Sequence, residues 1–201
     1  MIAVIDYGAG NLKSVEKAFL HLGCEVKVTG EKEIIETADK VVLPGVGAFG
    51  HAMQALRSAG MEEVVHRVVS RGTPLLGICV GLQLMFEKSE ESPGVKGLGL
   101  FSGNIVKIPL VEGLKIPQMG WNSLEINPRS RLLKGIPDGT FVYFVHSYYP
   151  ALQNPDDSIA RITYGIPFDV AVERENVFAT QFHPEKSGEW GLKILENFAS
   201  L

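Results

Sequence analysis

Short apolar segments alternate with stretches of helical spacing through the first half of this chain. The apolar segments are Ile2 to Asp6, Glu25 to Thr29, Lys40 to Leu43 and Pro74 to Cys79. Between the first two, residues 11–22 place four apolar side chains on one helical face, those of Leu12, Val15, Phe19 and Leu22. Parallel strands need such crossover connections, whose helices cover both faces of the sheet. We therefore expect an α/β fold with a mainly parallel, doubly wound open sheet flanked by helices.

The amino-acid composition changes after about residue 88, where Pro and Gly become frequent. Short apolar runs there predict extended segments, at Asn104 to Ile108, Trp121 to Ile126, Thr140 to Tyr148, Ile159 to Thr163, Val170 to Glu173 and Val177 to Gln181. A final helix from Trp190 to Leu201 can pack Leu192, Leu195 and Phe198 against the sheet. There is no internal repeat and no long linker, so we expect residues 1–201 to form a single domain with a β-rich second half.

Composition and charge exclude several classes of protein. The 201 residues are 45% hydrophobic, which is enough for one sizeable core. The net charge of -4 includes no Lys/Arg run suited to a phosphate backbone, so we expect no nucleic-acid partner. No apolar stretch approaches the roughly 20 residues that span a bilayer, so we expect no membrane segment. Two cysteines are too few for the disulfide framework of a secreted chain, which favours a reducing cytoplasm.

The segment from Leu76 to Leu84 has a glycine two residues before Cys79 and another two residues after it. This spacing is typical of a nucleophile elbow, a sharp strand-to-helix turn in which small neighbours make room for a strained central residue. The helix N-terminus that follows also favours a thiolate. The alternative is an ordinary buried cysteine beside a tight turn. Cys24 lacks this setting and is predicted to be a small core residue.

Among the five histidines, His183 has the sequence context of a catalytic base. It follows an apolar strand that Pro184 ends, at the sheet edge where the Cys79 turn is also expected. Glu185 is placed to orient the imidazole. A histidine that merely ends a strand is the alternative, but the Cys79 turn favours a triad of Cys79, His183 and Glu185. Three other histidines lie in helical patterns with nothing to orient the ring, namely His21, His51 and His66.

A glycine-rich turn from Pro44 to Gly50 lies between another predicted strand and a helix. Acyl transfer needs donors aimed at the developing oxyanion, and the candidates are the amides of Val46, Gly47 and Val80. A phosphate-binding loop is the weaker alternative, because no Gly-Lys-Ser/Thr completes the pattern. The segment from Tyr7 to Asn11 resembles half of a dinucleotide fingerprint, but its third glycine is missing, so a tight turn explains it adequately.

Together, the Cys79 elbow and the segment from His183 to Glu185 resemble the class I, triad-type glutamine amidotransferases. Four motifs are similar to one branch of that family, the glutaminases of the histidine pathway. These motifs are Pro44 to Gly50, Gln118 to Asn122, Tyr143 to Tyr148 and Gln181 to Ser187. The resemblance covers essentially the whole chain. One departure is Val80, where relatives often carry leucine, but its backbone amide is unaffected.

The resemblance implies hydrolysis of L-glutamine to glutamate and ammonia through a glutamyl thioester on Cys79, with His183 as base and then acid. It also implies a set of substrate-binding residues, namely Gly45, Gln83, Glu91, His146, Ser147 and Tyr148. Neither a metal nor an organic cofactor is required. The residues alone leave alternatives for two of these. Gln83 can be a core residue with its amide bonded internally, and Glu91 lies in an acidic run that can be a solvated face.

The resemblance further implies that the ammonia passes to a (β/α)8 cyclase partner in a heterodimer. Ammonia is mostly protonated at neutral pH and is then a poor nucleophile, so a dry path would keep it neutral. Such a path needs a substantial, stable interface on the crevice side of the sheet. Candidate interface residues are Asn11, Trp121, Asn122, Tyr143 and Lys186. Trp121 and Tyr143 can equally be core residues.

Three other functions remain open from the sequence. The chain could feed ammonia to another synthase, such as those of pyridoxal phosphate, guanylate, anthranilate or carbamoyl phosphate. It could be a catalytically silent binding or regulatory subunit, although the intact Cys79, His183 and Glu185 set argues against this. It could also be a stand-alone cysteine hydrolase or peptidase of similar sheet architecture.

Overall fold

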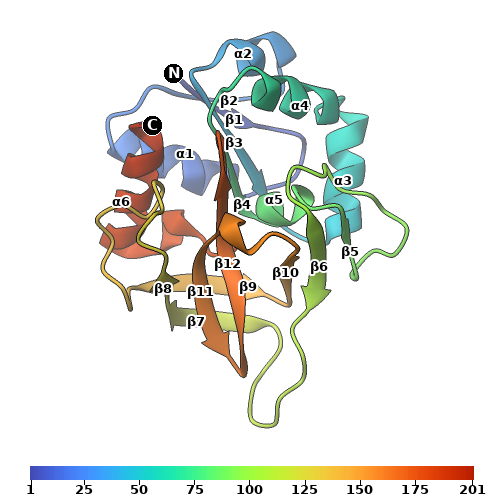
Figure 1. Ribbon diagram of the computed structural model, residues 1–201. Helices are drawn as coiled ribbons and strands as arrows, with labels where there is room; N and C mark the ends of the chain where they lie inside the picture. The colour runs from blue at the N-terminus through green and yellow to red at the C-terminus, as the bar shows by residue number, and fades with distance from the viewer.

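Eight strands form the central sheet of the computed structural model, which describes residues 1–201 (Figure 1). In chain order they are β1 (Ile2–Ile5), β2 (Val26–Thr29), β3 (Lys40–Gly45), β4 (Leu75–Cys79), β8 (Glu125–Ile126), β11 (Ser158–Tyr164), β12 (Ile166–Arg174) and β13 (Val177–Thr180). Their order in space is β2-β1-β3-β4-β13-β12-β11-β8. The first five strands pair in parallel and the last three add antiparallel. The predicted α/β class with a mainly parallel, doubly wound sheet is confirmed.

The central strands are buried on both faces. Every residue of β1, β4 and β13 is buried, and β3 is buried except at its first residue. Strands of this kind read as continuous apolar runs rather than alternating ones, because helices cover both faces of a parallel sheet. This is why the sequence showed them clearly.

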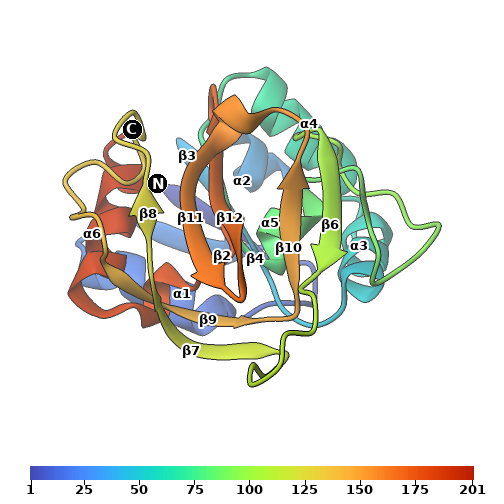
Figure 2. The same ribbon diagram turned by 60° about the horizontal axis from the view of Figure 1, so that its bottom comes forward.

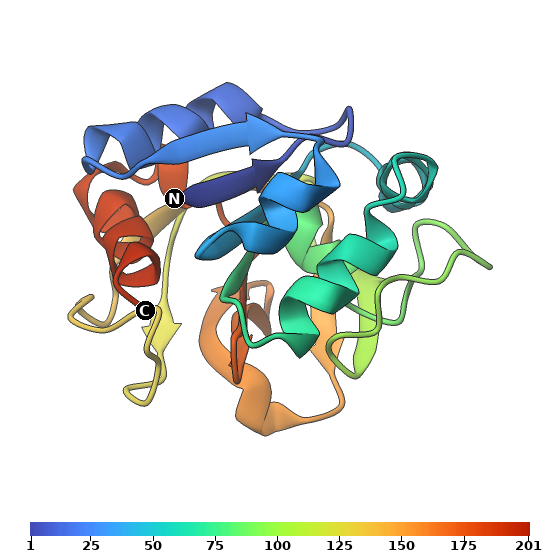
Figure 3. The ribbon, with the colours of Figure 1, turned by 90° about the horizontal axis from the view of Figure 1, so that it is seen from above.

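Helices cover both faces of the central sheet, with one group of helices on each face (Figure 3). They are α1 (Leu12–His21), α2 (Lys32–Thr37), α3 (Phe49–Ser58), α4 (Glu62–Ser70), α5 (Val80–Leu84) and α6 (Gly188–Ala199). Helices α1 and α6 contact each other, α2 packs with α4, and α3 packs with α5. The predicted apolar face of α1 buries Val15 and Phe19, and the ring of Phe19 lies 6.3 Å from that of Phe198 in α6. None of the helices combines the length and apolar character needed to cross a membrane.

The second half adds two smaller sheets, which lie next to β11 and β12 of the main sheet (Figure 2). One contains β5 (Lys88–Ser89), β6 (Gly103–Lys107) and β10 (Tyr148–Leu152), and the other contains β7 (Gln118–Ser123) and β9 (Phe141–His146). Two short 3-10 helices, η1 (Pro155–Asp157) and η2 (Pro184–Lys186), complete the structure. We refer to the β7 and β9 pair as the β7–β9 ribbon.

Two predicted extended segments are each divided in the structure. The segment from Trp121 to Ile126 belongs to β7 and β8, which join different sheets on either side of buried Leu124. The segment from Thr140 to Tyr148 is divided at Ser147, because β9 pairs with β7 whereas β10 pairs with β6. Long-range pairing, which the local apolar pattern does not contain, sets both divisions.

Candidate active site

Cys79 occupies a sharp turn between β4 and α5. Its backbone angles are φ 57° and ψ -112°, in the left-handed half of the map that non-glycine residues rarely adopt. The turn lies tightly against β3, since a Cβ on Gly81 would come within 1.9 Å of the Leu43 carbonyl oxygen. A Cβ on Gly77 would come within 2.8 Å of the Met85 side chain. The strand-to-helix elbow predicted from the glycine spacing is therefore present.

His183 reaches the same edge of the sheet from the neighbouring strand. Strand β13 pairs directly with β4, with Thr180 opposite Ile78, and His183 lies in the turn that follows. Its Nδ1 is 2.8 Å from Oε1 of Glu185, and both side chains are almost fully buried. The sheet order thus brings together the three residues predicted as a triad, Cys79, His183 and Glu185.

The electrostatics of this pair favour a protonated imidazole. Burial by itself lowers the pKa of His183, but the Cys79 thiol and the Glu185 carboxylate together outweigh it and raise the pKa to about 9. Nε2 of His183 makes no hydrogen bond of normal length to a protein atom, and His183 lines the same cavity as Cys79. This arrangement leaves Nε2 available to exchange a proton with the thiol or with a bound molecule.

Two glutamines form a chain of contacts beside the thiol. Nε2 of Gln181 lies 3.7 Å from Sγ of Cys79, and Oε1 of Gln181 accepts a hydrogen bond of 3.0 Å from Nε2 of Gln83. Both side chains are buried. Gln83 therefore combines the two roles considered for it, because its amide is bonded internally and it also lines the cavity. Sequence reasoning did not single out Gln181, although a polar residue directly after a fully buried strand is a usable signal.

The glycine-rich turn after β3 lies over the same cavity. Val46 and Gly47 line it together with Val80, and neither the Val46 nor the Gly47 amide donates to another protein atom. These amides are free to donate to a ligand, as an oxyanion hole requires. Gly45 does not line the cavity. Its place is explained by packing, since a Cβ there would come within 2.7 Å of the Gly81 amide nitrogen.

The cavity has a volume of about 290 Å³ and opens beside the thiol. Its lining residues are Val46, Gly47, Cys79, Val80, Gln83, Glu91, Pro117, Val145, His146, Ser147, Tyr148, His183 and Lys186. Five of the six predicted substrate-binding residues are among them. This volume is at the low end for small-molecule sites and suits a ligand of amino-acid size.

Glu91 is partly buried and is hydrogen-bonded to the protein. Its Oε2 accepts a 2.7 Å hydrogen bond from the Phe49 amide at the start of α3, and the residue also lines the cavity. Burial, followed by the charges of Glu91 and Glu90, raises the pKa of Tyr148. A carboxylate and a phenol therefore both line the cavity. They offer a negative charge and a polar hydroxyl to a ligand.

His146 serves the structure more directly than it serves a ligand. Its Nδ1 lies 2.8 Å from the Tyr148 carbonyl oxygen and its Nε2 lies 2.9 Å from the side-chain oxygen of Gln118. Burial lowers the pKa of His146 to about 4, against the opposing effect of the Tyr148 carbonyl, so the ring is neutral at pH 7. A neutral ring has one N–H, so only one ring nitrogen donates, and we assign this bond to Nδ1 and the Tyr148 carbonyl oxygen. Nε2 faces the Gln118 side-chain amide, whose O and N positions are interchangeable. Both ring nitrogens therefore face protein groups, and His146 contributes to the cavity wall rather than a free hydrogen-bonding group.

The predicted interface residues do not all lie on one surface. Trp121 and Tyr143 face each other across the β7–β9 ribbon with ring centres 6.1 Å apart, and Nζ of Lys186 lies 5.9 Å from the Tyr143 ring. Asn122 points to the other face of the ribbon and donates to the Thr163 carbonyl. Asn11 lies at the start of α1. Lys186 also lines the cavity, so the cavity opens beside the Trp121 and Tyr143 face.

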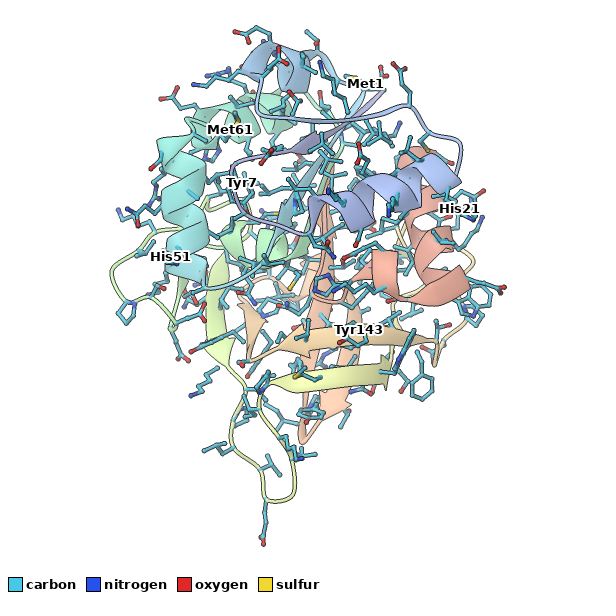
Figure 4. The ribbon with its side chains drawn as sticks, turned by 180° about the vertical axis from the view of Figure 1, so that it is seen from behind. Met1, Tyr7, His21, His51, Met61 and Tyr143 are labelled. Carbon is cyan, nitrogen blue, oxygen red and sulfur yellow. The ribbon has the colours of Figure 1, made fainter.

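The three remaining histidines lie in helices, as predicted, and all three are exposed. Figure 4 shows His21 and His51 at the outside of the molecule, away from Tyr143, and His66 is likewise exposed on α4. Cys24 is partly buried and packs against the core. None of the four lines the cavity beside Cys79.

A family model and two similar proteins place this chain in the same family. The family model for "Glutamine amidotransferase class-I" matches residues 3–200. A protein of Methanothermobacter thermautotrophicus is 51% identical over 201 residues, covering 100% of this chain and 98% of its own length. A protein of Methanocaldococcus jannaschii is 48% identical over 203 residues, covering 100% of both chains. Both are named imidazole glycerol phosphate synthase subunit HisH.

Solved structures share the fold at lower identity. One described as a glutamine amidotransferase superposes with a TM-score of 0.77 at 22% identity, covering 99% of this chain and 100% of its own. The structure of PurLQS from Thermotoga maritima also gives a TM-score of 0.77, at 19% identity, covering 99% of this chain and 97% of that chain.

Proposed function

The chain belongs to the class I glutamine amidotransferases, and from that membership we propose that it is the glutaminase subunit of imidazole glycerol phosphate synthase. In this role it hydrolyses L-glutamine to glutamate and ammonia. The observation that carries the proposal is the strained elbow at Cys79 beside the buried His183 and Glu185 pair. A catalytically silent subunit would have no need to keep this strained geometry.

The reaction proceeds by acyl transfer to the Cys79 sulfur. The thiolate attacks the side-chain carboxamide carbon of glutamine, and His183 donates a proton to the departing nitrogen, which leaves as ammonia. The product is a glutamyl thioester. His183 then takes a proton from water, the hydroxide adds to the thioester, and glutamate leaves as the thiolate is restored. Glu185 holds the imidazole in position and stabilises its protonated form throughout.

The developing oxyanion lies beneath the glycine-rich turn. The unbonded amides of Val46 and Gly47, with that of Val80 at the start of α5, are the donors that we assign to it. Such donors stabilise the transition state more than the ground state, because the carbonyl oxygen gains charge only during attack.

The glutamine backbone groups occupy the other end of the cavity. Glu91 supplies a carboxylate for the α-ammonium group, and Ser147 and Tyr148 supply polar groups for the α-carboxylate. Gln83, held by Gln181, lies along the side chain of the substrate. His146 and Gly45 act indirectly, as cavity wall and as close packing.

The ammonia passes to a (β/α)8 cyclase subunit in a heterodimer. An exposed apolar face of the β7–β9 ribbon supports this assignment, since Met119, Trp121 and Phe141 are all exposed there. Lys186 joins this face to the cavity. Of the candidate interface residues, we place Trp121, Tyr143 and Lys186 within this surface, whereas Asn122 on the other face of the ribbon and Asn11 at the start of α1 lie outside it. The nucleophilic thiol of Cys79 must stay reduced, so we place the protein in the cytoplasm.

The test is glutamate release from glutamine by the chain alone and together with the cyclase and its nucleotide substrate. We expect strong stimulation by the partner, complete dependence on Cys79 in a Cys79→Ala variant, and full activity in the matched control Cys24→Ala. Equal activity with and without the partner would instead identify a stand-alone hydrolase. No activity under any of these conditions would identify a silent binding subunit.

A further inference from the structure

The loop from Tyr7 to Asn11 contacts Pro44, the first residue of the glycine-rich turn. Strand β1 pairs with β3 only as far as Val42. Two residues after β1 ends, the hydroxyl of Tyr7 donates a 2.8 Å hydrogen bond to the Pro44 carbonyl oxygen. Proline has no N–H, so this carbonyl is its only backbone group able to hydrogen-bond. The tight turn predicted from the sequence therefore makes a specific long-range contact.

The same loop also contacts the ring of Pro44. A Cβ on Gly10 would lie 3.4 Å and 3.5 Å from the Cγ and Cβ atoms of Pro44. Gly10 has φ +134°, which side-chain-bearing residues rarely adopt. Tyr7 thus holds the carbonyl of Pro44 while Gly10 packs on its ring. Tyr7 is buried, and Figure 4 shows it inward of the helix that carries His51.

The Tyr7 hydroxyl lies next to the nucleophile elbow as well. A Cβ on Gly45 would come within 3.0 Å of the hydroxyl oxygen and within 2.7 Å of the Gly81 amide nitrogen. Tyr7 is buried, and burial, followed by the charge of Cys79, raises its pKa. The phenol therefore keeps its proton and remains a donor at neutral pH.

We propose that Tyr7 is a positioning residue for the oxyanion hole, because its hydroxyl fixes Pro44 and so holds the Val46 and Gly47 amides over Cys79. This inference rests on the proposed glutaminase function. Those two amides have no protein acceptor of their own, so the turn depends on its ends for its position. At the other end, Glu91 and Ser92 accept from the amides of Phe49 and Gly50. Tyr7 fixes the end that is closer to the elbow.

The test compares Tyr7→Phe with a matched control, Tyr164→Phe. Tyr164 makes the same kind of bond, a 2.7 Å donation to the Lys115 carbonyl, but it lies on β11 away from the cavity. Both variants are assayed in complex with the cyclase and its nucleotide substrate. We expect Tyr7→Phe to lower kcat about tenfold while KM for glutamine changes less than about twofold. Tyr164→Phe is expected to leave both constants unchanged.

Alkylation by iodoacetamide separates the oxyanion hole from the nucleophile. Alkylation of Cys79 forms no oxyanion, so its rate is expected to be the same in Tyr7→Phe and the wild type. Unchanged kcat in a folded Tyr7→Phe variant would overturn the inference, and so would a parallel fall in the alkylation rate. Gly10→Ala keeps the hydroxyl but strains the loop backbone at φ +134° beside Pro44, and it gives a second variant that is expected to lower kcat in the same way. Failure of the wild-type complex to release glutamate would count against the proposed function itself, before any variant is compared.

Discussion

Cys79 is one of only two non-glycine residues with positive φ, the other being Glu175. A conformation of this kind costs of order 1–3 kcal/mol and persists only where the surrounding structure determines it. Here Gly77, Gly81 and the backbone of β3 leave the turn no room to relax. The strain keeps the thiol above the sheet edge, at the position that attack on a carboxamide requires.

The protonation of His183 depends on its two neighbours, which gives a pH prediction. With the pKa of His183 at about 9, kcat/KM for glutamine is expected to fall as the pH rises through that value, because the imidazolium that protonates the leaving nitrogen is lost. In Glu185→Gln a negative charge that raises this pKa is removed. We expect the alkaline limb of the profile to move to lower pH and kcat to fall about tenfold or more.

The matched control for this prediction is Glu189→Gln, an exposed carboxylate at the start of α6. Its pH profile should coincide with that of the wild type. If the alkaline limb stays in place in Glu185→Gln, Glu185 does not set the protonation of His183, and its role is limited to orienting the ring.

At the scale of elements, the approach of α5 to β3 depends on glycine. A Cβ on Gly81 would come within 1.9 Å of the Leu43 carbonyl oxygen, which is backbone and cannot rotate away. Gly81→Ala is therefore expected to separate the elbow from β3, to lower the free energy of unfolding by about 1–3 kcal/mol, and to abolish most glutaminase activity.

Gly72→Ala is the control for Gly81→Ala. Gly72 has φ +79° but open space around it, so alanine there introduces backbone strain without a clash. We expect reduced stability in denaturant unfolding but wild-type kcat. Comparable kcat in the two variants would show that the close approach of α5 to β3 is dispensable for catalysis.

The elements show why some of the site could be predicted and some could not. Cys79, His183 and Glu185 lie in turns whose glycine and proline chemistry is local, so their placement could be predicted from a few neighbouring residues. Gln181 and Tyr7 act through partners far away in the chain, Gln83 and Pro44, and no local pattern contains such pairings. The division at Ser147 was missed for the same reason. The parallel sheet was predictable because its strands are apolar throughout.

At the scale of the whole molecule, two buried histidines titrate in opposite directions. The pKa of His146 is lowered to about 4, so between about pH 6.5 and 4 the unfolded chain binds a proton that the native chain does not. Stability is therefore lost as the pH falls through this range. The pKa of His183 is raised to about 9, so its contribution is complete below about pH 6.5 and is lost as the pH rises through 9.

The two effects predict maximal stability near pH 6.5, which denaturant unfolding across the pH range can measure. His146→Gln is expected to reduce the loss of unfolding free energy below about pH 6.5. His183→Gln is expected to reduce the loss at alkaline pH. An equally steep loss at acid pH in His146→Gln would assign the loss of stability to other groups.

The exposed face of the β7–β9 ribbon gives a prediction about assembly. Trp121 is 56% exposed and stands beside Tyr143. Trp121→Ala is expected to weaken binding of the cyclase about tenfold or more in a titration followed by calorimetry. Trp190→Ala removes an exposed tryptophan of α6 and serves as the control, for which no change in affinity is expected. Equal affinities for the two variants would remove this face from the proposed interface.

The position of β13 in the sheet has a consequence for the protein during its synthesis. This strand is the last to leave the ribosome, yet it lies in the middle of the sheet, between β4 and β12, and the turn after it carries His183. A nascent or truncated chain that stops before β13 contains the thiol but no base to serve it. Such a fragment lacks the proposed catalytic base, so glutamine hydrolysis is expected to begin only after β13 has been made and has inserted between β4 and β12.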